Sequence, residues 1–98
     1  MMTSIEKRQY LREKHWEQSR LAERRGDYQK ALEIHKRILA EDRASYAVFL
    51  RAGWLSFRLG AYEEAIGYYE QALAISNDEW PLQGIKSCRA ALGVTAAA

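Results

Sequence analysis

Apolar side chains recur at steps of three and four residues along two segments of the chain, which predicts two amphipathic helices. The first helix begins at Tyr28 and the second at Tyr62, and a glycine precedes each by two positions. Their predicted apolar faces are Tyr28, Ala31, Leu32, His35, Ile38 and Leu39 in the first helix, and Tyr62, Ala65, Ile66, Tyr69, Ala72, Leu73 and Ile75 in the second. Because Gly26 and Gly60 can adopt a left-handed conformation, we expect them to end the preceding helices.

Three further segments show helical patterns. Residues 3–25 predict a long polar helix, whereas residues 45–59 predict a helix with a wide apolar surface. A shorter helix follows, for which Asp78 or Asn77 can be the N-cap, and Pro81 suits its first turn. Its predicted apolar face is Leu82, Ile85, Cys88 and Leu92. The pattern therefore predicts an all-α protein of about five helices.

The two amphipathic segments also repeat one another. The sequences "GDYQKALEIHKRILAED" and "GAYEEAIGYYEQALAIS" begin at Gly26 and Gly60, and both carry the spacing Gly-x-Tyr-x-x-Ala. The distance between these glycines gives a period of about 34 residues with two helices per unit, which resembles the tetratricopeptide repeat family. The resemblance implies a right-handed α-solenoid built from antiparallel helix pairs. His35 stands where the second copy has the aromatic Tyr69, so we expect it to be a packing residue.

In this register residues 1–98 form a single domain. Its expected parts are an N-terminal helix extension (3–11), a first repeat (12–45), a second repeat (46–79), a capping helix (80–93) and a frayed tail (94–98). A polar terminal repeat and a single closing helix are what a stacked array needs at its ends.

The family resemblance implies a concave inner wall, built from the first helix of each unit, that binds an extended peptide or a partner's helix. Mapped by the repeat register, the predicted partner-binding residues are Trp16, Arg20, Leu50, Arg51, Trp54, Phe57 and Arg58. Ile85 and Cys88 of the capping helix are expected on the same wall. Tryptophan, phenylalanine and arginine are typical of interaction hot spots. The alternative interpretation is that Trp54 and Phe57 only pack against neighbouring helices.

One subgroup of the family clamps the C-terminal carboxylate of chaperones with Lys, Asn, Asn, Lys and Arg on this wall. The matching positions here hold Trp16, Arg20, Arg51, Pro81 and Ile85, and none is the residue that the clamp uses. A chaperone-tail clamp is therefore not expected.

Composition changes this picture little. The formal net charge is +2, and the basic residues near the N-terminus are interleaved with glutamates, which is typical of a solvated helix. No apolar run is long enough for a secretory signal or a membrane span, so we expect a cytoplasmic protein with no membrane partner. The two histidines and the one cysteine lack metal-ligand spacing, and no catalytic arrangement is evident. We therefore expect no enzyme activity, cofactor or small-molecule substrate.

Three functions remain open on the sequence. The first is a non-catalytic protein-interaction module or scaffold that binds a peptide or a helix. The second is a homo-oligomeric building block, because short repeat arrays can pair through their ends. The third is a helical-repeat RNA binder, suggested by the density of lysine and arginine at residues 7–25 and disfavoured by the interleaved glutamates and the small net charge.

Overall fold

The computed structural model describes residues 2–41 and 45–93, and within these ranges the chain forms five α-helices and no strand. The helices are α1 (Ser4–Arg24), α2 (Tyr28–Glu41), α3 (Tyr46–Arg58), α4 (Tyr62–Ile75) and α5 (Glu79–Ala91). The predicted all-α fold is thus confirmed. The predicted frayed tail, 94–98, lies outside the described residues.

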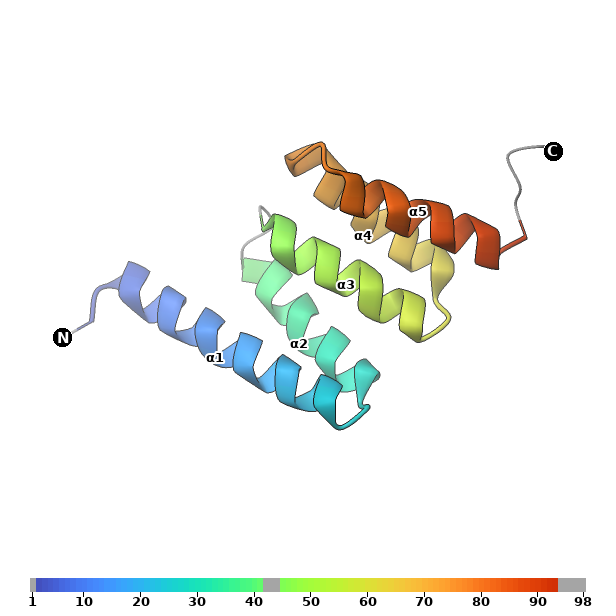
Figure 1. Cartoon of the computed structure of the whole chain (residues 1–98). Coiled ribbons are helices and arrows are strands. Elements are labelled where there is room, and N and C mark those ends of the chain that lie inside the picture. Colours follow the sequence, from blue (N-terminus) through green and yellow to red (C-terminus); the bar gives the residue numbers. More distant parts are fainter. Residues whose placement is uncertain (1, 42–44, 94–98) are drawn as a thin grey trace.

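Successive helices run antiparallel and stack in one direction (Figure 1). Helices α1, α3 and α5 point the same way and form one layer, and α2 and α4 return behind them. The molecule measures 59 × 30 × 18 Å. Since packed helices lie roughly 8–10 Å apart, the shortest dimension corresponds to two layers of helices. This is the arrangement of a helical-repeat solenoid. The unit boundaries at 12–45 and 46–79 remain a prediction.

Side-chain caps define where four of the helices begin. The Thr3 hydroxyl accepts a hydrogen bond from the Glu6 amide at 3.1 Å, and the Ser45 hydroxyl accepts one from the Val48 amide at 3.3 Å. The Asp78 carboxylate accepts from the Glu79 amide at 2.7 Å and so caps α5, as predicted. Asp27 accepts from the Lys30 amide at 3.1 Å at the start of α2. Ala61, which precedes α4, offers no side-chain cap.

Left-handed glycines end α1 and α3. The φ angle is 79° at Gly26 and 80° at Gly60, a region that residues with a Cβ atom avoid. Each glycine turns the chain back so that the following helix packs against the one it leaves. The repeated glycines of the sequence therefore act where the pattern predicted, at the turn inside each helix pair.

Two clusters of buried side chains hold the stack together. The larger cluster joins α1 and α2 to α3 and α4, and its central members are Ala31, Leu32, Val48, Phe49, Ala52, Leu55 and Ala72. The smaller cluster joins α4 to α5 and contains Ala65, Tyr69, Ile85 and Cys88. His35 is fully buried, which confirms its expected packing role. Ile34 is also buried, although the helical pattern did not place it on the apolar face.

The prediction for the last helix, at the C-terminal end of the stack, is partly wrong. Ile85 and Cys88 are buried as expected, together with Pro81, but Leu82 and Leu92 are 49% and 40% exposed. Ile85 and Cys88 therefore pack against α4 rather than standing on the concave wall. They are apolar residues at the register positions where α3 has Arg51 and Trp54, so burying them leaves no charge unpaired. Ile75, expected on the buried face of α4, is 44% exposed.

None of the helices in residues 2–41 and 45–93 combines the length and the apolar character needed to cross a membrane.

Candidate functional site

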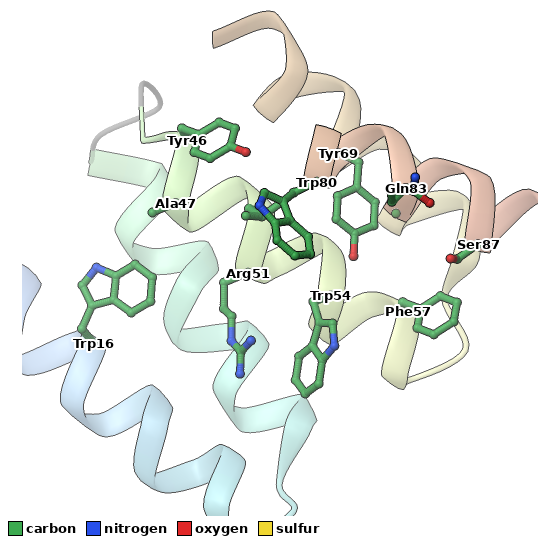
Figure 2. A pocket seen from close by; sticks show the side chains of 12 residues that line it. Trp16, Tyr46, Ala47, Arg51, Trp54, Phe57, Tyr69, Trp80, Gln83 and Ser87 are labelled. Atoms are coloured by element: carbon green, nitrogen blue, oxygen red, sulfur yellow. The ribbon is translucent and has the colours of Figure 1, made fainter. Parts of the chain in front are cut away.

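A groove of about 530 Å³ opens on the layer formed by α1, α3 and α5. Figure 2 shows side chains from all three helices around it, with Trp16 on the α1 side and Trp80, Gln83 and Ser87 on the α5 side. The described residues that line it are Trp16, Tyr46, Ala47, Leu50, Arg51, Trp54, Phe57, Tyr69, Trp80, Gln83, Gly84 and Ser87. Most of these side chains are apolar or aromatic, so the groove is suited to excluding water from a bound apolar surface.

The structure brings most of the predicted partner-binding residues together. Trp16, Leu50, Arg51, Trp54 and Phe57 all line the groove, and each is half-buried. The other two predicted residues, Arg20 on α1 and Arg58 at the end of α3, are exposed and do not line it.

Arg51 is the one charged residue among the described residues that line the groove, and its charge is already paired. Its Nε donates to Glu23 Oε2 at 3.2 Å, and its Nη2 forms an ion pair with Glu23 Oε1. The Glu23 side chain is 9% exposed and the Arg51 side chain 39%. A two-point contact of this kind fixes the guanidinium in one orientation. The pair therefore connects α1 to α3 and leaves the groove without a free charge.

Trp54 has neighbours within the chain. The guanidinium carbon of Arg51 lies 4.1 Å from the centre of the Trp54 ring, and that of Arg58 lies 5.7 Å away. The Tyr28 ring meets Trp54 edge-on at 5.8 Å, and Arg58 also donates to the Tyr28 hydroxyl at 3.4 Å. Because a cation is attracted to the face of an aromatic ring, this cluster attaches α3 to the start of α2. Trp54 thus has a packing role and also lines the groove.

Tyr69 of α4 reaches the floor of the groove by passing between α3 and α5. A Cβ atom added at Gly53 would lie 2.8 Å from Tyr69 Cε1, and one added at Gly84 would lie 2.4 Å from Tyr69 Cζ. Both distances are too short for real contacts, so glycine is required on either side of the ring. Burial raises the pKa of Tyr69 to about 12, which keeps the hydroxyl protonated.

Sequence reasoning missed the α5 side of the groove. Trp80 is the most exposed large apolar residue of those described, at 70%, and it stands on the edge of the groove. The repeat register could have indicated Trp80, because it stands one repeat period after Tyr46 and both residues line the groove. Tyr46 itself is held in place by its hydroxyl, which donates to Asp78 Oδ2 at 2.9 Å.

The family of the chain follows from comparison with known proteins. The family model for the tetratricopeptide repeat matches residues 22–86, which is well over half of the 98 residues. The chain belongs to the tetratricopeptide repeat family. No curated protein matches the chain. Tetratricopeptide repeats generally mediate protein–protein interaction, and the groove lies on the layer made by α1, α3 and α5.

Cys88 and His35, two further titratable residues of this tetratricopeptide repeat protein, are buried. Cys88 is fully buried, and burial raises the pKa of its thiol. Burial, followed by the positive charge of Arg51, lowers the pKa of His35 to about 4, and its ring meets Trp16 edge-on at 4.8 Å. Among residues 2–41 and 45–93, no cluster of three His, Cys, Asp or Glu side chains could hold a metal ion.

Proposed function

We propose that the protein is a non-catalytic interaction module that binds a protein partner in the groove between α1, α3 and α5. The observation that carries the proposal is the exposed aromatic edge of a preformed apolar groove. Trp80 is 70% exposed, and Trp16, Leu50 and Phe57 are half-buried around the same hollow. Tryptophan side chains that are ordered at the edge of a pocket are typical anchors of protein interfaces.

The binding residues under this proposal are Trp16, Leu50, Phe57 and Trp80, with Arg51 and Trp54 on the wall between them. Arg51 and Trp54 are held by contacts within the chain, so they supply a rigid surface at little entropic cost. Arg20 and Arg58 are not assigned to the groove.

The test is affinity capture with purified wild-type protein and two variants. Trp80→Ala removes the exposed anchor, and Leu82→Ala is the matched control, since it truncates an exposed apolar residue of the same helix that does not line the groove. The proposal expects a partner that is captured by the wild type and by Leu82→Ala and is lost with Trp80→Ala. That partner must then bind the wild type as a purified pair. Capture that is equal for all three proteins, or no capture, contradicts the proposal.

A homo-oligomeric building block is the second candidate. It is favoured by exposed apolar side chains on the first and last helices, with Leu21 of α1 43% exposed and Leu82 and Leu92 at the C-terminal end 49% and 40% exposed. Light scattering over a tenfold range of protein concentration tests it. A mass that stays at 11.3 kDa rejects the candidate, and a mass that rises with concentration supports it.

A further inference from the structure

The chemistry of the groove selects among protein partners, starting with its charge. Arg51 is the one charged group among the described lining residues, and Glu23 neutralises it through contacts at both Nε and Nη2. The guanidinium carbon also lies 4.1 Å from the centre of the Trp54 ring. Because Glu23 already holds two of the five N–H donors of Arg51, the guanidinium attracts a partner carboxylate less strongly than an unpaired arginine would. The groove therefore disfavours an acidic anchor on the partner.

The hydrogen-bonding capacity of the groove is also low. Besides Arg51, the lining offers one side-chain amide, Gln83, one aliphatic hydroxyl, Ser87, the Tyr69 hydroxyl and the indole N–H groups of three tryptophans, each a single donor. The Tyr46 hydroxyl is already engaged with Asp78. An extended peptide brings one donor and one acceptor for each residue, and those buried without partners oppose binding. A helix brings its backbone groups already paired, so it loses nothing by entering an apolar groove.

The side-chain amide and the aliphatic hydroxyl of the groove lie on one side of it. Gln83 and Ser87 are four positions apart and lie on the same face of α5, and Figure 2 shows them along that side of the groove. The opposite side and the floor are formed by Trp16, Trp54 and Tyr69. A partner that fits must therefore present an apolar stripe with a polar flank, which is the surface of an amphipathic helix.

We infer that the occupant of the groove is an amphipathic helix of a partner protein, which inserts large apolar side chains beside Trp16 and Trp80 and has no acidic anchor. The inference rests on the proposed function and narrows it to one class of partner. The helix lies over the groove with residues at i, i+3 or i+4, and i+7 directed inward. Its polar flank faces α5, where Gln83 and Ser87 can hydrogen-bond to it.

Selection from a random library of displayed peptides, each long enough for about four helical turns, tests the inference without knowledge of the natural partner. The library is selected on the wild-type protein and depleted on Trp80→Ala. We expect the enriched peptides to carry apolar residues at helical spacing and to show no preference for a C-terminal Asp or Glu. The binding of synthetic copies is then measured by calorimetry. Trp80→Ala should weaken binding at least about tenfold, and Leu82→Ala should change it less than about twofold.

Two modified peptides separate helix recognition from general apolar attraction. A proline at the centre of the peptide disrupts a helix, so binding should fall by about 100-fold. The same peptide with a neutral, amidated C-terminus should bind within about twofold of the free acid.

The possible outcomes separate failure of the helix inference from failure of the proposed interaction function. Peptides that need Trp80 but tolerate the central proline, or that require a free carboxylate, overturn the helix inference and leave the interaction module standing. If no enriched peptide depends on Trp80, the inference and the proposed groove function both fail.

Discussion

The two repeats differ most at the aromatic position of their second helices. Unit 2 has Tyr69 on α4, whose ring needs glycine on both sides, at Gly53 and Gly84. Unit 1 has His35 at the matching position of α2, and the positions that correspond to the two glycines hold Ser19 and Leu50. In the repeat register, the smaller ring of His35 thus corresponds to positions that carry side chains, and the larger ring of Tyr69 corresponds to positions that hold glycine.

The two rings also differ in their access to the groove. Tyr69 and Gly84 both line the groove, because without a side chain at Gly84 the ring is the floor on that side. In unit 1 the Trp16 ring meets His35 at 4.8 Å, and His35 is fully buried. The ring of His35 is therefore covered by Trp16, whereas the ring of Tyr69 lines the groove.

The largest expected effect comes from placing at Gly84 of α5 the residue that stands one repeat period earlier, Leu50 of α3. Gly84→Leu places a side chain where even a Cβ atom would lie 2.4 Å from Tyr69 Cζ, so we expect a loss of about 3 kcal/mol or more in the free energy of unfolding. In a Tyr69→His background the same substitution should cost at least about 1 kcal/mol less. Urea denaturation of the four proteins measures this coupling. An equal cost in both backgrounds would show that the Tyr69 ring is not the obstacle.

His35 can gain a proton at acidic pH, which Tyr69 cannot. The pKa of His35 is about 4 in the folded protein, against about 6.5 for an ordinary histidine, so the unfolded chain binds more protons between these values. The contribution of His35 to the free energy of unfolding is therefore fully present above about pH 6.5. It is lost as the pH falls toward 4, by up to about 3 kcal/mol. The measurement is urea denaturation between pH 7.5 and 4.5.

Two variants isolate the contribution of His35 from that of the carboxylates. His35→Phe should reduce the acid-induced loss of stability, while His15→Gln, which changes the other histidine of the chain, should retain it. If the pH profiles of His35→Phe and the wild type run parallel, burial of His35 does not cause the loss.

Much of the fold could be predicted from the sequence, but part of the groove could not. The repeat period, the two glycines before Tyr28 and Tyr62 and the cap at Asp78 predicted the helices because each acts locally. The period also placed Trp16 and Trp54 near one another on the inner layer. These features depend on spacing along the chain, which the sequence states directly.

The predictions that were wrong or missing concern contacts between helices, which depend on how neighbouring helices pack. Ile85 and Cys88 were assigned to the inner wall by copying the register of α3, but on α5 these positions pack against Ala65 and Tyr69. Trp80 was overlooked because its role comes from the groove beside it and not from its own helix. The Glu23–Arg51 pair joins two helices that are distant in the sequence, a contact that no helical period predicts.

The third prediction concerns the stability contributed by Trp54, one of the three tryptophans that line the groove. Trp54 is half-buried and contacts Arg51, Arg58 and Tyr28, so Trp54→Ala should reduce the free energy of unfolding by about 2 kcal/mol. Trp54→Phe keeps an aromatic face for the cations and should lose less than half as much. Thermal and urea unfolding followed by circular dichroism measure both. If Trp54→Ala unfolds like the wild type, the contacts around Trp54 contribute nothing to joining the units.

The smallest expected effect on stability belongs to Trp80. Its ring is 70% exposed, so Trp80→Ala should change the free energy of unfolding by less than about 0.5 kcal/mol. Leu82→Ala, on the same helix, should do the same, which makes the two variants a matched pair for binding experiments. A residue that contributes little to folding and stands on the edge of an apolar groove is free to serve a partner. Trp54 would then stabilise the packing of the helices, and Trp80 would contact the partner. A loss of more than about 1 kcal/mol for Trp80→Ala would instead make Trp80 part of the core and remove the anchor on which the groove assignment depends.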